Sequence, residues 1–249
     1  MRTAVLLAAG EGRRLGGRKP LVGLRGRPLA WYPVSVLHLL GVVEFIVVTR
    51  GQLARELRRL VEEVAGPGSA QVVVNSEPWR ENGWSLILGL EEACSGSPCS
   101  TMVSMSDHVY SPRLAARLLY FQGPRGYLVG CDREPQFIDT GEATRVSAVG
   151  GVVTRMSKRL RHWFCADTGV HRVERLPPGI LEEAARTGGE WPVARLAGLV
   201  SSLGSIGLAW TVDVTGLPWT EVDTPEDLRE AEEGERSRVV DEVLSWLHG

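Results

Sequence analysis

The sequence predicts an α/β fold, a Rossmann-like mixed and mainly parallel sheet flanked by helices. Three observations support this prediction. Short runs of branched apolar residues alternate with amphipathic stretches through the first half of the chain, as in right-handed βαβ units. The first apolar run leads directly into a glycine-rich turn. With 249 residues, 43% of them hydrophobic, the chain is also long enough to bury one full core. We therefore predict a single domain over residues 1–249.

The first half supplies the predicted parallel strands and the helices between them. Four runs are rich in branched apolar residues and are predicted to be buried strands: Thr3–Leu7, Glu44–Thr49, Gln71–Asn75 and Thr101–Met105. Three amphipathic stretches lie between them and are predicted to be helices: Ala30–Leu40, Gln52–Ala65 and Ser85–Glu92.

The second half is more irregular. The predicted strands here are a hairpin, Thr144–Val149 with Gly151–Met156, and two further runs, Phe164–Val170 and Ser205–Val212. The predicted closing helices are Thr224–Glu233 and Ser237–Leu247. The first of these opens with Thr224 followed by Pro225, and proline is favoured at the first helical position.

Charge and hydropathy exclude several classes of protein. The formal net charge is −2 and the arginines are spread over many segments, which argues against a nucleic-acid partner. No apolar run reaches the roughly 18 residues of a membrane span, so we expect no membrane-embedded segment. The first strand flows into the glycine-rich turn and does not read as a signal peptide, so a cytoplasmic location is expected.

The four cysteines, Cys94, Cys99, Cys131 and Cys165, show no CxxC or Cys/His zinc spacing. We expect them to be small buried hydrophobic residues with free thiols. A disulfide between Cys94 and Cys99 is the alternative.

Lysine usage is more informative. Of the 28 basic residues, only Lys19 and Lys158 are lysines. A compact ammonium group suits a tight phosphate site better than a broad guanidinium, so both positions are candidate phosphate ligands. The alternative is that these two lysines were retained by chance.

The glycine-rich turn over residues 7–21 is the first candidate site. It follows a strand, so it leaves the carboxyl edge of the sheet, where open α/β folds bind ligands. Gly10 and Gly12 lack the third glycine of a dinucleotide fingerprint, and Lys19 precedes Pro20 rather than the Ser or Thr of a Walker loop. Glycines alone would also fit an ordinary tight loop. Together with Arg13 and Lys19, they predict a loop that binds phosphates through backbone N–H groups and two cations.

Two acidic residues are candidate metal ligands. Asp107 stands just past the strand Thr101–Met105, and Asp223 precedes the first closing helix. Magnesium prefers one or two carboxylates together with phosphate oxygens and water. The alternatives are that Asp107 caps a helix starting near Pro112 and that Asp223 is only the turn before its helix. We expect His108 to have a structural role.

These motifs resemble the nucleotidyltransferases that activate sugar phosphates and other phosphorylated alcohols. Within that superfamily the chain is most similar to CTP:inositol-1-phosphate cytidylyltransferases, from about Arg2 to Ala231. The narrower matching segments are Asn82–Leu86, Met105–Tyr110, Cys131–Pro135, Gly141–Thr144 and Asp167–Gly169. The chain departs from the family at three positions. Trp84 replaces a usual tyrosine, Ser106 replaces a common glycine, and Glu221 replaces a frequent aspartate.

The resemblance implies a role for each matching position. Asp107 and Asp223 would hold Mg²⁺, Arg13 and Lys19 would bind the triphosphate, and Lys158 would meet the phosphate of the acceptor. Further nucleotide contacts would come from Leu7, Ala8, Ala9, Gly10, Gly12, Asn82, Gly83, Ser85 and Asp107. Further contacts to the acceptor would come from Asp132, Glu142, Thr144, Asp167, Thr168 and Gly169. Residues 1–125 would then form a nucleotide-binding half of a nucleotide-diphospho-sugar transferase fold, 126–222 an acceptor-binding half, and 223–249 the closing helices.

The implied reaction joins CTP and inositol-1-phosphate to give CDP-inositol and pyrophosphate. In the family this is the activating step of di-myo-inositol phosphate synthesis, an osmolyte pathway of thermophiles. Some members carry a fused membrane domain that makes the phosphodiester, and since this chain has no such spans we expect it to perform the activating step alone. One alternative is another acceptor, either a sugar-1-phosphate or a phosphocholine held in a tryptophan cage. A second is a regulatory relative without catalysis. The sequence leaves a homodimer open.

Overall fold

The computed structural model describes residues 2–95, 97–98, 100–189 and 191–248. One mixed sheet of nine strands runs through these residues in the order β5-β4-β1-β6-β11-β8-β12-β10-β9. Its strands are β1 (Thr3–Ala8), β4 (Glu44–Thr49), β5 (Ala70–Val74), β6 (Ser100–Met105), β8 (Gly126–Asp132), β9 (Arg145–Val149), β10 (Val152–Ser157), β11 (Cys165–Glu174) and β12 (Ala209–Asp213). Two small ribbons accompany it: β2 (Gly23–Leu24) with β3 (Arg27–Pro28), and β7 (His108–Tyr110) with β13 (Trp219–Glu221).

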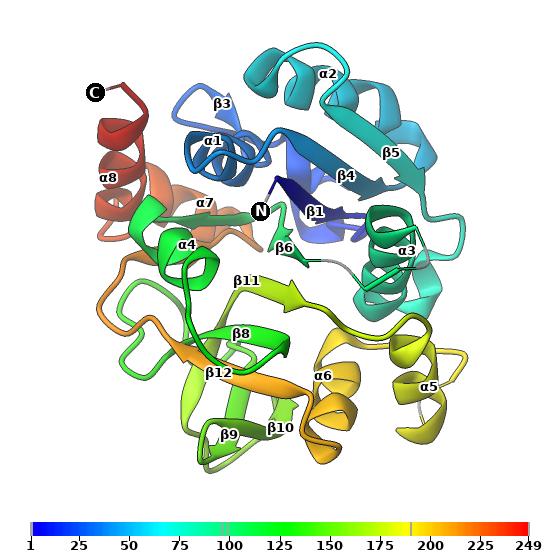
Figure 1. Ribbon diagram of the computed structural model, residues 1–249. Coiled ribbons are helices and arrows are strands. Elements are labelled where there is room, and N and C mark those ends of the chain that lie inside the picture. Colours follow the sequence, from blue (N-terminus) through cyan, green and yellow to red (C-terminus); the bar gives the residue numbers. More distant parts are fainter. Residues whose placement is uncertain (1, 96, 99, 190, 249) are drawn as a thin grey trace.

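The helices cover both faces of the sheet (Figure 1). They are α1 (Trp31–Leu39), α2 (Ala54–Ala65), α3 (Asn82–Cys94), α4 (Pro112–Leu119), α5 (Ile180–Thr187), α6 (Leu196–Ser205), α7 (Pro225–Glu232) and α8 (Ser237–His248). Alternate residues of β1 enter two separate cores, as the period of two in a strand requires. Leu6 packs with buried residues of α1, α2, α4 and α8. Leu7 packs with buried residues of α3, α5 and α6.

The sheet changes character at β6. Strands β5, β4, β1 and β6 are parallel, and their carboxyl ends therefore meet at one edge. Beyond β6, the long strand β11 is antiparallel to both β6 and β8. The beginning of β11 also pairs with β9, so β11, β8, β12, β10 and β9 close on themselves. This curled half stands next to the carboxyl edge of the parallel half, where the predicted site lies.

The predicted α/β fold class is confirmed, and so are the strands and helices of the first half. The hairpin is also confirmed as β9 and β10, and the two closing helices as α7 and α8. Thr224 and Asp227 form a capping box at the start of α7, with Pro225 as its first residue. The strand predicted over Ser205–Val212 is wrong in its first part. Ser205 ends α6, and the chain turns at Gly207, which has φ of 75°, before β12 begins.

The prediction of free thiols is wrong. Cys131 of β8 and Cys165 of β11 form a disulfide, with their Cα atoms 5.4 Å apart. The two cysteines are 34 residues apart in sequence, and only the antiparallel pairing of their strands brings them together. Cys94 is also disulfide-bonded. The predicted pair Cys94–Cys99 involves Cys99, which lies outside the described residues.

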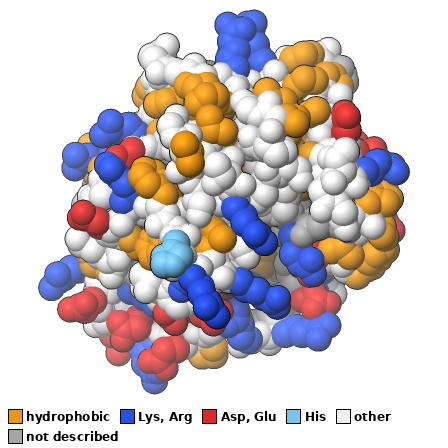
Figure 2. Space-filling view, turned by 90° about the horizontal axis from the view of Figure 1, so that it is seen from below, with side chains coloured by type: hydrophobic (Ala, Val, Ile, Leu, Met, Phe, Trp, Pro, Cys, Tyr) orange, Lys and Arg blue, Asp and Glu red, His pale blue; other side chains and the backbone are white. Residues whose placement is uncertain are grey.

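The outer surface carries charges of both signs. Figure 2 shows the face below β9, β10 and β12, on which Lys and Arg side chains are interspersed with acidic and apolar ones. This face is therefore unlike the continuous basic surface that neutralises a nucleic-acid backbone. Within the described part of the chain, no helix combines the length and hydropathy needed to cross a membrane.

Candidate active site

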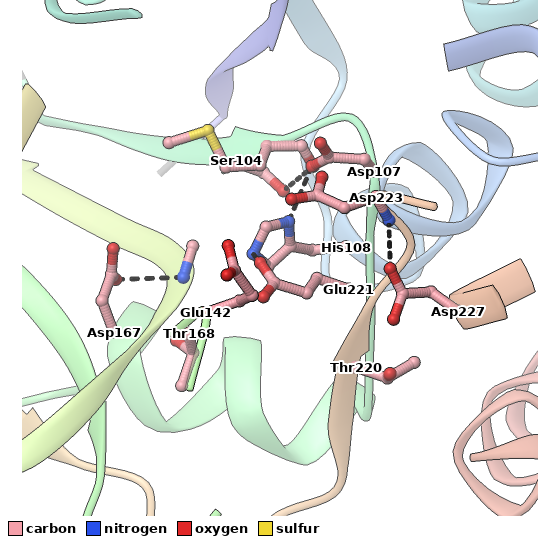
Figure 3. A network of polar contacts seen from close by, with 12 residues as sticks. Ser104, Asp107, His108, Glu142, Asp167, Thr168, Thr220, Glu221, Asp223 and Asp227 are labelled. Carbon is pink, nitrogen blue, oxygen red and sulfur yellow. Dashed lines mark hydrogen bonds and ion pairs between the residues drawn. The ribbon is translucent and has the colours of Figure 1, made fainter. Parts of the chain in front are cut away.

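The ammonium group of Lys19 is the centre of the site. Its Nζ contacts both Oδ2 of Asp107 and Oδ1 of Asp223. Lys19 begins a short 3₁₀ helix after the glycine-rich loop, and Asp107 follows β6. Asp223 stands between β13 and α7, where its backbone N–H donates to Asp227 Oδ2 at 3.0 Å. Three residues distant in sequence thus meet at one point, as Figure 3 shows for the two aspartates.

The charges at this point stabilise one another. Burial alone would raise the pKa of Asp107, but Lys19 and His108 hold that pKa well below its usual range. Burial alone would lower the pKa of Lys19, but the two carboxylates raise it above its usual value. Both groups are therefore ionised at neutral pH.

The loop before Lys19 depends on its glycines and on an arginine from β4's end. Gly12 has φ of 57°, and a Cβ at this position would lie 2.6 Å from Cβ of Lys19. Arg50 donates from Nη2 to the carbonyl oxygens of Gly17 and Glu11 and so fixes the loop. The backbone at Leu7 is fixed as well, because its carbonyl accepts from Ser106 N–H at 3.1 Å.

The two neighbouring arginines of this loop have different partners in the protein, and the contact of Arg13 with a triphosphate stays a prediction. Arg13 is 83% exposed and pairs with Glu11, with Nε 2.6 Å from Oε2. Its neighbour Arg14 is the one that contacts Asp223, with Nη2 3.3 Å from Oδ2. Neither Arg14 nor Arg50 was predicted from the sequence to lie at the site. Arg50 could have been, because it directly follows a predicted strand whose carboxyl end faces the site.

His108 and Glu221 extend the cluster. His108 Nδ1 lies 2.7 Å from Oδ1 of Asp107, and its Nε2 lies 3.5 Å from Oε2 of Glu221. Burial would lower the pKa of His108, but the neighbouring carboxylates, Asp107 foremost, raise it. Burial, together with Asp223 and Asp107, raises the pKa of Glu221 despite the opposing effect of His108. Asp107 is not a helix cap; Ser111 caps α4.

Three predicted nucleotide contacts lie at the start of α3 and are engaged within the protein. Asn82 Oδ1 accepts from the backbone N–H of Leu196, and Ser85 Oγ accepts from Asn75 Nδ2 at 3.0 Å. A Cβ on Gly83 would lie 2.5 Å from the carbonyl oxygen of Ala194. The side chains of Asn82 and Ser85 therefore shape the start of α3, and their contact with a nucleotide stays a prediction. Ala8, Ala9 and Gly10 continue β1 towards the same edge of the sheet.

Several predicted acceptor contacts are also occupied by protein partners. Asp132 is buried and accepts from Trp219 Nε1 at 2.9 Å. Asp167 Oδ1 accepts from Gly169 N–H at 3.0 Å and lies 2.7 Å from His171 Nε2. Thr168 is buried, and its hydroxyl donates to the carbonyl of Gly130 at 3.1 Å. These three side chains therefore hold neighbouring parts of the protein in place, and their contact with an acceptor stays a prediction.

Lys158 faces the site from the far side. Its Nζ lies 4.0 Å from Oε2 of Glu142, and both side chains are more than half exposed. The positive charge of Lys158 also acts on Glu221, where it partly offsets the rise in the pKa of that carboxyl. The backbone of Thr144 accepts from Asp167 N–H at 2.8 Å and places the start of β9 against β11. The structure therefore brings both lysines of the chain to one cluster.

The donor set fits a hard divalent cation with a bound triphosphate. Asp107 and Asp223 each direct an oxygen to the same point, which a cationic group occupies. Among the described residues, no group of three or more His, Cys, Asp or Glu side chains is arranged to hold a metal by itself. Two carboxylates leave coordination positions for phosphate oxygens and water, which is how magnesium is commonly held in nucleotide sites.

Comparison with known families matches residues 4–175 to the MobA-like NTP transferase domain. The chain belongs to this family. The match covers the glycine-rich loop, Lys19 and Asp107, and it ends before Asp223. The NTP transferase fold predicted from the sequence is thereby confirmed.

Individual members similar to this chain carry more specific names. A protein of Thermococcus kodakarensis named "Bifunctional IPC transferase and DIPP synthase" is 36% identical over 233 residues, which is 92% of this chain and 49% of that protein. A protein of the same name from Rubrobacter xylanophilus is 36% identical over 241 residues, or 92% of this chain and 51% of that one. The chain thus spans about half the length of these relatives.

A solved structure has the same fold as this chain. The inositol-1-phosphate CTP transferase from T. maritima superposes with a TM-score of 0.80 over 98% of this chain and 96% of that one. The two sequences are 22% identical, so this likeness shows the shared fold.

The first testable prediction concerns Lys19. Replacing Lys19 with Met leaves two carboxylates facing each other, and we expect it to lower the free energy of unfolding by about 3 kcal/mol at neutral pH. Since Asp107 has a lowered pKa in the wild type, its pairing stabilises the fold above about pH 3.9, and this stabilisation is lost on acidification. In Lys19→Met, the lysine no longer opposes the effect of burial, so the pKa of Asp107 rises. The loss of stability relative to the wild type should therefore be smaller at pH 4 than at pH 7.

Denaturant unfolding at several pH values measures this difference. Arg18→Met is the matched control, because it removes an exposed neighbouring ion pair with Glu56. We expect that control to change stability by less than about 1 kcal/mol. A Lys19→Met deficit that is the same at pH 4 and pH 7 would contradict the assigned charges.

Proposed function

We propose that the chain transfers a cytidylyl group from CTP to inositol-1-phosphate and releases pyrophosphate. The observation that carries this proposal is the convergence of Lys19, Asp107 and Asp223 at the carboxyl edge of the parallel strands. The family and its relatives supply the class of reaction and the substrate names. The product, CDP-inositol, would be an activated alcohol for di-myo-inositol phosphate synthesis.

The chemistry requires little from the protein beyond positioning and charge. A phosphate oxygen of the acceptor attacks the α-phosphorus of CTP, and the bond to the pyrophosphate group breaks in line with the attack. The attacking phosphate is already ionised at neutral pH, so no general base is needed. Lys19 and the arginines of the loop would bind the triphosphate, and Lys158 would bind the acceptor's phosphate from the opposite side.

Asp107 and Asp223 would hold Mg²⁺. When bound, this ion neutralises charge on the triphosphate oxygens. Lys19 lies against the same carboxylates and would keep them oriented towards the phosphates. The glycine-rich loop, which Arg50 holds in place, would offer backbone N–H groups to the phosphates at the same edge.

The acceptor side suits a polyol phosphate. Lys158 interacts with both Glu142 and Glu221, and Figure 3 shows the carboxylate of Glu221 beside His108. Carboxylate oxygens accept hydrogen bonds from hydroxyl groups, and an ammonium binds a phosphate. A phosphorylated alcohol with several hydroxyl groups matches this pairing of groups.

The rival acceptor phosphocholine is less well supported. It would need an aromatic cage for its quaternary ammonium. Trp84 and Trp191 already enclose Arg80, whose Cζ lies 3.3 Å and 4.6 Å from the two ring centroids. Trp31 is covered in the same way by Arg27, at 5.0 Å. A regulatory relative without catalysis is also disfavoured, because the two carboxylates and Lys19 are kept and brought together.

The experiment that tests the proposed function is a substrate panel. The protein is incubated with Mg²⁺, each of the four nucleoside triphosphates, and a series of phosphorylated alcohols that includes inositol-1-phosphate, glucose-1-phosphate and phosphocholine. We expect the fastest release of pyrophosphate with CTP and inositol-1-phosphate. Equal rates with GTP would contradict the cytidine preference and leave the class of reaction standing.

Metal dependence gives a further prediction. Activity should disappear in excess chelator and return with Mg²⁺, because carboxylates and a triphosphate repel one another without a cation. Asp107→Asn and Asp223→Asn should each lower kcat by at least about 100-fold, the scale of one lost electrostatic contact to the transition state. Asp241→Asn, which removes an exposed carboxylate on α8, is the control and should leave kcat unchanged. Full turnover in chelator would refute the metal assignment.

Lys158 gives the sharpest test of the acceptor site. Lys158→Ala should raise KM for inositol-1-phosphate by about 10- to 100-fold, the value of a charge-assisted contact, with little change in KM for CTP. Lys19→Ala should chiefly lower kcat. Arg159→Ala, at the exposed neighbouring position, serves as the control.

Lys158→Arg is the finer probe, because it keeps the charge and changes the shape of the cation. A close-fitting phosphate site should lose activity with the wider guanidinium. If Lys158→Arg matches the wild type in both constants, chance retention of this lysine becomes the better explanation. The acceptor's phosphate would then have to be sought at Arg133, Arg145 or Arg155.

A further inference from the structure

His108 joins two carboxylates through its two ring nitrogens. Nδ1 lies 2.7 Å from Oδ1 of Asp107, and Nε2 lies 3.5 Å from Oε2 of Glu221. The other oxygen of Asp107 contacts the ammonium of Lys19, and a carboxylate paired with a cation accepts hydrogen bonds, so Nδ1 is the donor in this bond. Because His108 occupies Oδ1, the other oxygen of Asp107, Oδ2, is the one that contacts Lys19.

The imidazole ring has two close neighbours. It is parallel to the indole of Trp219, with 3° between the ring planes and 6.1 Å between their centroids. It also lies against Gly169, where a Cβ would be 2.5 Å from both Cδ2 and Nε2 of His108. The backbone of His108 is fixed as well, because β7 pairs with β13 and places His108 opposite Glu221. The ring therefore has little freedom to rotate.

Each partner is itself anchored by a buried carboxylate. Trp219 donates from Nε1 to Asp132 Oδ2 at 2.9 Å, and both residues are at most 3% exposed. Gly169 lies in a β-bulge of β11, where the register against β8 shifts between Asp167 and His171. Its N–H donates to Asp167 Oδ1, and its φ of 68° suits glycine.

We propose that His108 is a positioning residue that fixes the carboxylate of Asp107 so that Oδ2 alone is offered to the divalent cation. Trp219 and Gly169 hold the ring in place, and through them Asp132 and Asp167 act on the metal site without touching substrate. This inference rests on the proposed function, in which Asp107 binds the cation. It also explains why segments so far apart in sequence converge behind the site.

The geometry disfavours a direct catalytic role for His108. Its side chain is 10% exposed, and both nitrogens face carboxylates. Hydrogen-bonded partners of metal ligands typically change metal affinity or activity by about 10- to 100-fold when removed. The expected signature is therefore a loss of cation binding with an unchanged KM for the acceptor.

The test measures Mn²⁺ binding to the protein in the presence of CTP and without an acceptor, by calorimetry. His108→Phe keeps a flat ring against Trp219 but has no donor, and it should weaken Mn²⁺ binding by about 10- to 100-fold. His108→Asn keeps an N–H donor near the position of Nδ1 and should bind Mn²⁺ within about threefold of wild type. His38→Phe is the matched control, because Nδ1 of His38, on α1, hydrogen-bonds the backbone carbonyl of Val42 at 3.0 Å.

A second variant tests the contact between Gly169 and the ring of His108. Gly169→Ala should displace the ring of His108, disturb its contact with Asp107 and weaken Mn²⁺ binding in the wild-type background. In the His108→Asn background the smaller side chain removes the collision, so the same substitution should have a clearly smaller effect. Steady-state kinetics of His108→Phe should show a raised requirement for Mg²⁺ while KM for inositol-1-phosphate stays within about twofold, and His38→Phe should match the wild type in both.

The outcomes separate this inference from the proposed function. If wild type and His108→Phe bind Mn²⁺ with CTP equally tightly, and both unfold cooperatively, the positioning role is wrong while the proposed function stands. Equal effects of Gly169→Ala in both backgrounds would likewise show that Gly169 does not act through the ring of His108. If CTP does not enhance Mn²⁺ binding even in the wild type, the proposed function fails and the role of His108 fails with it.

Discussion

The contact of one ammonium with two carboxylates is the interaction on which the site depends. Lys19 joins Asp107 at the end of β6 to Asp223 before α7, although Lys19 and Asp223 are 204 positions apart. Two carboxylates this close would repel each other and partly neutralise by binding protons. The ammonium removes that repulsion, so the carboxylates stay ionised in a place that is only 14 to 22% exposed. The close of the chain is thereby tied to its first loop.

The rest of the fold holds these three charges in place. Asp227 caps α7 and accepts from the backbone N–H of Asp223, and Arg236 pairs with the other oxygen of Asp227 at 2.7 Å. On the opposite side, the curled strands bring the bulge of β11 against His108. The carboxyl edge of the parallel strands supplies one wall of the site, and the closed half made of β11, β8, β12, β10 and β9 supplies the other. A mixed sheet can do this because β11 is long enough to pair with β6 near its end and with β9 near its beginning.

The parts that the sequence predicted are those with local signals. Strands such as β1 and β4 are short, branched and fully buried, and their pattern needs no knowledge of distant neighbours. Strand β8 was missed because it is buried over its whole length and therefore shows no alternating pattern. Helix α6 was missed although Leu196, Leu199, Val200 and Leu203 recur with a helical period, because the predicted strand was drawn over its last residue. The disulfide of Cys131 depends on strand pairing alone. Arg14 and Arg50 were missed for a related reason. Their contacts, with Asp223 and with the glycine-rich loop, depend on the tertiary structure and follow no sequence motif.

The choice of lysine at position 19 follows from the same charges. An arginine would spread its charge over a planar fork and bind one carboxylate through two parallel hydrogen bonds. That geometry would draw one aspartate to itself and leave the other unpaired. A tetrahedral ammonium has three donors in different directions, so it can contact Asp107 and Asp223 together and still direct a third N–H elsewhere. In a chain that uses arginine at 26 of its 28 basic positions, this requirement gives a physical reason for the exception at Lys19.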